Sequence, residues 1–129
     1  MSTEAAKPAR RWFWLLLVIW AGVLFWLSSS SGEGGLFGLL PAGSDKIAHG
    51  IAYLVLGAAG SMATGSRSGG ALLAVLFGIS DEIHQSFVPG RSADLWDLVA
   101  DSVGALLGAY LAPLLVWYPW RRRREPHVE

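Results

Sequence analysis

Residues 12–27 read WFWLLLVIWAGVLFWL, sixteen consecutive residues without a charged side chain. A helix rises about 1.5 Å per residue, so this run and the serines after it can cross the ~30 Å apolar core of a bilayer. Basic residues precede the run, and a cleaved signal peptide is therefore the alternative. The tryptophans at both of its ends favour a retained membrane anchor, because Trp concentrates at membrane interfaces.

Three further apolar runs follow, so the expected spans are about 12–30, 45–64, 70–88 and 95–118. None alternates every second residue as barrel strands do, and Ala, Leu and Gly dominate them, as in packed membrane helices. The sequence thus predicts an all-α polytopic membrane protein, a compact bundle of four transmembrane helices in one domain over 1–129. Pro113 offers an alternative end for the last helix near residue 112. Residues 36–40 could form a short amphipathic dip into the interface.

The composition supports this class, with 53% hydrophobic and only 16% charged residues and no cysteine. These values exclude a disordered chain, a coiled coil and a disulfide-stapled scaffold. The formal net charge of zero divides into +2 over 1–11, −4 over 12–120 and +2 over 121–129. Basic ends around an apolar middle do not suit a nucleic-acid partner. Lys and Arg in the short flanks predict that both termini are cytoplasmic, so the 28–44 and 89–94 loops face outside.

The last three spans carry ionisable side chains, which are costly inside a membrane and ask for a reason. Counting the helical rise places them all at similar depth in the outer leaflet. Each span holds its polar residues on one face: Asp45, His49 and Tyr53; then Asp81, Glu82, His84 and Gln85; then Asp94, Asp97 and Asp101, in line with Gly104 and Gly108. We expect the three faces to point at one another or into a small cavity open to the outside. The two glycines would let a neighbouring helix approach closely beneath them.

The alternative is a buried network that only fixes helix register. On that interpretation Asp45 and Asp94 cap the second and fourth helices, and His84 sits at the interface. Acids this close cannot all stay ionised without compensation. Some should therefore hold protons at neutral pH, or Lys46, Arg91 or a bound cation should compensate them.

The same residues resemble the VanZ-like family of bacterial membrane proteins. One block is Asp45-Lys46-x-x-His49-x-x-x-Tyr53-x-x-Leu56-Gly57. The other is Asp81-Glu82-x-x-Gln85-x-Phe87-Val88-Pro89-Gly90-Arg91, followed by Asp94, Asp97, Asp101 and Gly104-x-x-x-Gly108. The resemblance departs at Asp101, where the family commonly has Asn. It implies a multi-pass protein of the bacterial cytoplasmic membrane and a link to teicoplanin resistance, but no reaction.

Three functions are consistent with these features. The first is an outward-facing site that binds or modifies an envelope amphiphile: a lipid head group, a lipid-linked cell-wall intermediate or a lipoglycopeptide. Here Asp81, Glu82 and His49 are the candidate acid and base, and Arg91 would hold a phosphate or carboxylate. The remaining candidate binding residues are Asp45, Tyr53, His84, Gln85, Asp94, Asp97 and Asp101.

The second function is a metal-assisted hydrolase or transferase, with His49, Glu82, Asp97 and Asp101 as ligands, although no H-E-x-x-H motif or Ser or Cys nucleophile motif occurs. The third is a proton-linked carrier or assembly subunit. The acids stop at mid-membrane, so a path across the membrane would need a homo-oligomer. The sequence leaves open the ligand, any catalysed reaction, any cofactor and the oligomeric state.

Overall fold

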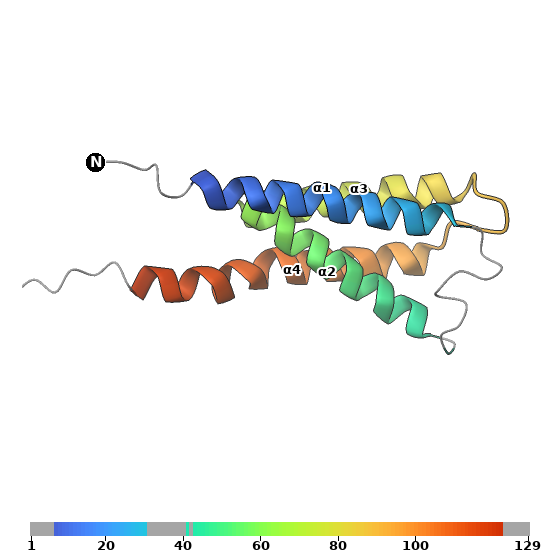
Figure 1. The fold of residues 1–129 in the computed structure, drawn as a ribbon. Helices are drawn as coiled ribbons and strands as arrows, with labels where there is room; N and C mark the ends of the chain where they lie inside the picture. The colour runs from blue at the N-terminus through green and yellow to red at the C-terminus, as the bar shows by residue number, and fades with distance from the viewer. Residues whose placement is uncertain (1–6, 31–40, 42, 123–129) are drawn as a thin grey trace, which may run out of the picture.

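The computed structural model describes residues 7–30, 41 and 43–122, and these residues form four helices and no strand. The helices are α1 (Lys7–Ser29), α2 (Ser44–Thr64), α3 (Arg67–Gln85) and α4 (Leu95–Arg122), arranged as an elongated bundle (Figure 1). The predicted all-α fold is confirmed. The expected amphipathic dip at 36–40 lies outside the described residues.

The helix ends differ from the prediction where local chemistry sets them. The α2 helix ends at Thr64 and is followed by its C-cap Gly65, whose φ of 72° is left-handed; Ser66 then caps α3 by accepting a hydrogen bond from the Gly69 N–H at 3.0 Å. Together they form a tight turn, and α3 therefore starts three residues before the expected 70 and ends three before the expected 88. The α4 helix continues past Pro113 to Arg122, so the alternative end near 112 is wrong.

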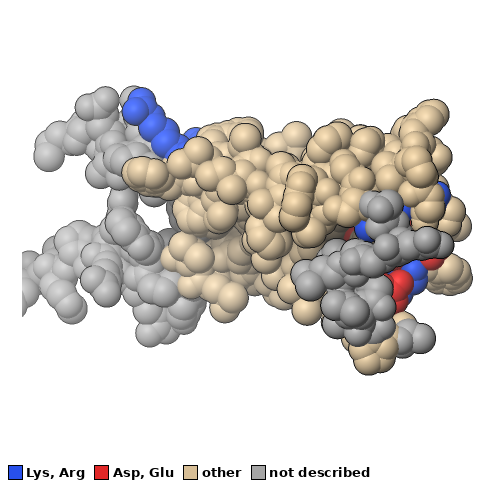
Figure 2. Space-filling model, turned by 45° about the vertical axis from the view of Figure 1, so that its right-hand side comes forward, with Lys and Arg blue, Asp and Glu red and all other residues tan. Residues whose placement is uncertain are grey.

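Three of the helices are long and apolar enough to cross a membrane: α1, α2 and α4. The α3 helix has 19 residues and is less apolar, because Asp81, Glu82, His84 and Gln85 fall in its last five positions. On the face drawn in Figure 2, the charged side chains of the described residues lie towards the two ends, and the middle is uncharged. This distribution fits a protein whose middle lies in lipid.

Glycines bring α2 and α4 into close contact where the two helices cross (Figure 1). A Cβ atom added to Gly104 would lie 2.0 Å from the carbonyl oxygen of Gly50, and one added to Gly108 would lie 1.9 Å from that of Leu54. The same holds from the α2 side, since a Cβ on Gly57 would lie 2.1 Å from the Ala105 oxygen. The expected close approach at Gly104 and Gly108 is confirmed. We call this contact the glycine seam.

The α1 helix is attached differently. Among the described residues of α1 the one buried apolar side chain is Leu24, and polar contacts attach the helix along its length. Near its start, Arg10 donates to the Thr64 carbonyl at 2.7 Å at the end of α2. In its middle, the Trp20 indole N–H donates to the Ala52 carbonyl at 2.9 Å. The start of α1 and the end of α4 lie at the same end of the bundle (Figure 1). Which side of the membrane that end faces remains a prediction.

Candidate functional site

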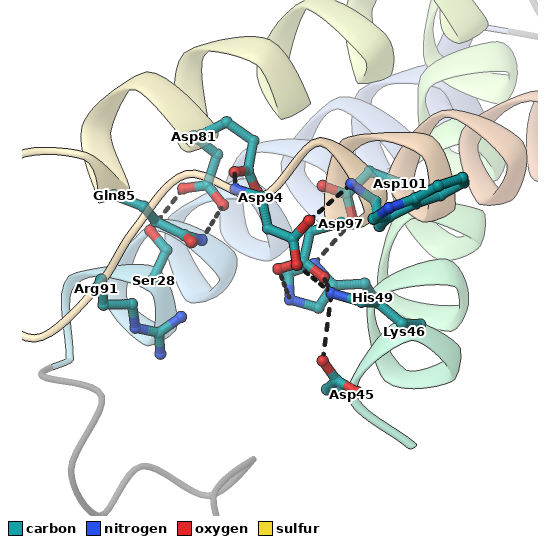
Figure 3. Close-up of polar contacts among 12 residues, drawn as sticks. Ser28, Asp45, Lys46, His49, Asp81, Gln85, Arg91, Asp94, Asp97 and Asp101 are labelled. Carbon is teal, nitrogen blue, oxygen red and sulfur yellow. Dashed lines mark hydrogen bonds and ion pairs between the residues drawn. The ribbon is translucent and has the colours of Figure 1, made fainter. Parts of the chain in front are cut away.

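The opposite end of the bundle gathers the polar side chains (Figure 3). Contacts between different helices join the three predicted polar faces, so they do point at one another. We call the set the polar layer; its members are Ser28, Asp45, Lys46, His49, Tyr53, Asp81, Glu82, Gln85, Arg91, Asp94, Asp97 and Asp101.

The outer part of the polar layer is paired through Lys46. Its ammonium group donates to Asp94 Oδ2 at 2.6 Å and to Asp97 Oδ1, and lies 3.4 Å from Asp45 Oδ2. The hydrogen bond from Lys46 holds the pKa of the Asp94 carboxyl below its usual range. For these three acids, the expected compensating cation is thus Lys46.

The two expected helix caps have different outcomes. Asp94 caps α4, because its Oδ1 accepts from the Trp96 N–H at 2.8 Å. The cap predicted for Asp45 is wrong: the N-cap of α2 is Gly43, which has a left-handed φ of 90° and provides no side-chain cap. Asp45 therefore falls within the first turn of α2, beside Lys46.

The inner part of the polar layer lies between α2, α3 and α4. His49 Nδ1 lies 2.9 Å from Asp101 Oδ1, and its Nε2 lies 3.9 Å from Asp97 Oδ2. Glu82 Oε2 accepts from the Asp94 N–H at 2.8 Å. Glu82 and Asp101 are both buried inside the bundle, and the Oε1 and Oδ2 atoms have no hydrogen-bond partner among the described residues. The two acids do not face lipid on opposite sides, which would have excluded a single site.

The side chain of Asp81 points to a different place, the contact with α1. Ser28 Oγ donates to Asp81 Oδ1 at 2.5 Å, while the Tyr53 hydroxyl and the Gln85 amide approach Oδ2 at 3.5 and 3.4 Å. A cavity of about 30 Å³ lies beside these groups. Its walls are Leu24, Leu27, Ser28, His49, Ala52, Tyr53, Asp81, Gln85 and Arg91. This volume accommodates one group of about the size of a water molecule.

Arg91 and His84 both contact the end of α1. Arg91 Nε donates to the Ser30 carbonyl at 3.0 Å, and its Nη2 is 3.4 Å from the Leu27 carbonyl. His84 Nε2 lies 2.9 Å from Ser29 Oγ, and its ring stacks on Phe25 with centroids 4.5 Å apart. Arg91 lines the cavity and His84 does not. Of the predicted residues, His84 is thus the one that neither contacts an acid among the described residues nor lines the cavity.

Ser28 is the residue that sequence reasoning missed, because it has no ionisable group and the first span was not counted among those that carry polar faces. The structure places Ser28 in the last turn of α1 and buries it against Asp81. The available signal was spacing. Leu24 and Ser28 are four residues apart and therefore share a helix face.

The arrangement does not add support for the metal-assisted hydrolase or transferase, the second predicted function. Within residues 7–30 and 41–122, as far as they are described, no group of three or more His, Cys, Asp and Glu side chains is placed so that it could hold a metal ion.

A family model described as VanZ/LLP1 matches residues 13–116, which include both sequence blocks named above. The predicted resemblance is confirmed. Neither the curated proteins nor the solved structures gave a match.

Proposed function

The chain belongs to the VanZ/LLP1 family, and we propose that it binds the polar head group of an envelope amphiphile at the cavity between α1, α2 and α3, with one small polar group of the ligand inside it. The observation that carries this proposal is the composition of the cavity wall. Leu24, Leu27 and Ala52 supply apolar surface, and Asp81, Gln85 and Arg91 supply polar groups. Sites for amphiphilic ligands combine such an apolar lining with a few placed polar groups.

The position of the cavity fits the head-group level of a bilayer. Three large aromatic side chains at the same end of the bundle, Trp26, Phe87 and Trp96, are largely exposed. Exposed tryptophans are typical of the membrane–water interface. The start of α1, with Arg10 and Arg11, and the end of α4, with Arg121 and Arg122, lie at the opposite end of the bundle, so the positive-inside rule predicts that the cavity lies in the outer leaflet.

Lipid bound to the purified protein tests the proposal. Native mass spectrometry after incubation with vesicles of phosphatidylethanolamine and phosphatidylglycerol should detect retained lipid. Arg91→Gln should reduce the retained amount. Arg67→Gln should not, because Arg67 is an exposed residue at the opposite end of the bundle. Equal retention by both variants, or none by the wild type, would contradict the proposal.

An effect on glycopeptide susceptibility belongs to the same proposal. Binding of a cell-wall intermediate or of the lipid tail of teicoplanin at the outer face would change how much antibiotic reaches its target. A bacterial host that expresses the wild type should become less susceptible to teicoplanin, and expression of Arg91→Gln should give a smaller change. Identical teicoplanin susceptibility with and without the protein would exclude the proposed effect on glycopeptide susceptibility.

One observation favours a second candidate, a proton-linked carrier or assembly subunit. Glu82 Oε1 and Asp101 Oδ2 are buried without hydrogen-bond partners among the described residues, and acids inside membrane proteins often relay protons. Proton flux into liposomes that falls in Glu82→Gln would support this function. Flux equal to that of empty liposomes would exclude it.

A further inference from the structure

We infer that the head group bound at this cavity places a primary ammonium group in it and carries a neighbouring phosphate beside Arg91, as phosphoethanolamine does. This inference rests on the proposed function and narrows its ligand to one chemical class. The argument starts from two opposite charges that line one cavity and do not contact each other.

The negative charge is Asp81, which is 4% exposed. All of its hydrogen-bond partners among the described residues are neutral, namely Ser28, Tyr53 and Gln85. The lysine of the polar layer is already bound to Asp45, Asp94 and Asp97. A buried carboxylate without a cation is unfavourable, so the Asp81 side of the cavity favours a cationic group.

The positive charge is Arg91. It lines the same cavity, and its contacts among the described residues are the carbonyl oxygens of Ser30 and Leu27, with no carboxylate. Nε and Nη2 donate hydrogen bonds to these oxygens, and the third guanidinium nitrogen, Nη1, makes no hydrogen bond to a described residue. Arginine is well suited to phosphate because its planar donors match the phosphate oxygens.

The end of α1 keeps the two charges apart. Ser28 Oγ donates a hydrogen bond to Asp81 Oδ1. Arg91 donates to the carbonyl oxygens of Leu27 and Ser30, which precede and follow Ser28 in the chain. Figure 3 shows Ser28 between the two groups, with the guanidinium turned away from the carboxylate. A ligand that neutralises both must carry a cation towards Asp81 and an anion towards Arg91.

The size of the cavity selects among cations. About 30 Å³ suits a group as small as water, and a primary ammonium has that size. A trimethylammonium group is several times larger and has no N–H to donate to Asp81. Phosphatidylethanolamine should therefore bind better than phosphatidylcholine, which is too large, and better than phosphatidylglycerol, which has no amine.

The test compares the affinities of these three lipids for the full chain in detergent micelles. We expect phosphatidylethanolamine to bind about tenfold more tightly than either other lipid, as one hydrogen-bonded charge pair would give. Asp81→Asn keeps the side-chain shape and should lose this preference while still binding lipid through Arg91. Arg91→Gln should weaken all three lipids, and Arg67→Gln should change none.

Each result separates the two proposals. Equal affinity for the three lipids, still dependent on Arg91, would overturn the ammonium inference and leave the head-group proposal standing. Binding of no lipid would overturn both. Competition by soluble O-phosphoethanolamine as strong as by the lipid would support the ammonium–phosphate chemistry and assign it to a free solute, against the amphiphile. A tenfold preference that survives in Asp81→Asn would also overturn the inference.

Discussion

The α2–α4 pair and the α1 helix are held by opposite means. At the glycine seam the two backbones touch, because Gly104 and Gly108 have no side chain to separate them from Gly50 and Leu54. The α1 helix instead has polar contacts near both ends and one buried apolar side chain, Leu24, among the described residues.

The difference divides the roles within the bundle. Lys46 of α2 and the acids Asp94 and Asp97 beside it, at the start of α4, form an ion-paired group on the two helices joined by the seam. The α1 helix provides one wall of the cavity, through Leu24, Leu27 and Ser28. We expect this wall to yield before the glycine seam when a ligand enters, because side-chain contacts rather than backbone contact hold it.

The strongest test of this comparison adds one methyl group at the seam. Gly108→Ala should lower the free energy of unfolding in detergent by about 1–3 kcal/mol, because the new Cβ meets the Leu54 carbonyl oxygen. Gly22→Ala on α1 is the matched control, since nothing lies within 4 Å of its Cβ. It should be neutral or stabilise by up to about 1 kcal/mol. A similar loss of unfolding free energy in both variants would contradict the difference between the glycine seam and α1.

The next test removes the buried hydroxyl between α1 and α3. Ser28→Ala leaves Asp81 Oδ1 without its donor at 2.5 Å and should lower the free energy of unfolding by about 1–3 kcal/mol. Ser29→Ala removes an exposed hydroxyl and should have a smaller effect. Thermal denaturation of both variants measures the difference, and a larger loss in Ser29→Ala would show that Ser28 does not hold α1.

A third test loosens the wall and leaves the seam intact. Arg91→Gln removes the donors to the Leu27 and Ser30 carbonyls, a loss of about 1 kcal/mol. Amides near the end of α1 should then exchange with deuterium about fivefold faster, while those of α2 and α4 near Gly57 and Gly104 keep their rates. Uniform acceleration over all helices would mean that the wall and the seam open together.

The smallest expected effect concerns the outer ion pairs. Lys46 holds the pKa of Asp94 below its usual range. The ionised Asp94 therefore stabilises the folded protein at pH values above the pKa of the unfolded state, and this stabilisation is lost as pH falls through the lowered pKa. Asp94→Asn should therefore melt slightly below the wild type at pH 7, and the gap should close below about pH 4. A gap that widens in acid would show that Asp94 is not stabilised as a carboxylate.

Much of the bundle could be predicted, because each helix exposed to lipid must satisfy its own backbone and cover itself with apolar side chains. The seam followed from the four-residue spacing of Gly104 and Gly108. The helix ends were less predictable, because they depend on single residues such as Gly43 and Ser66.

The division of the polar layer could not be predicted from spacing. Asp81 and Glu82 are neighbours in sequence and were assigned to one acid–base group. Successive residues of a helix point about 100° apart, and the structure turns Asp81 towards Ser28 of α1 and Glu82 towards Asp94 at the start of α4. Which neighbour each side chain contacts depends on how α3 is rotated about its axis relative to α1 and α4, and this rotation cannot be read from one sequence.

The most direct test of the head-group proposal is a crystal structure of the protein grown in a lipid mesophase that contains phosphatidylethanolamine. We predict electron density for a head group at the cavity, with its amine inside at Asp81 and its phosphate beside Arg91. A cavity without lipid density, with Arg91 paired directly to Asp81, would contradict it.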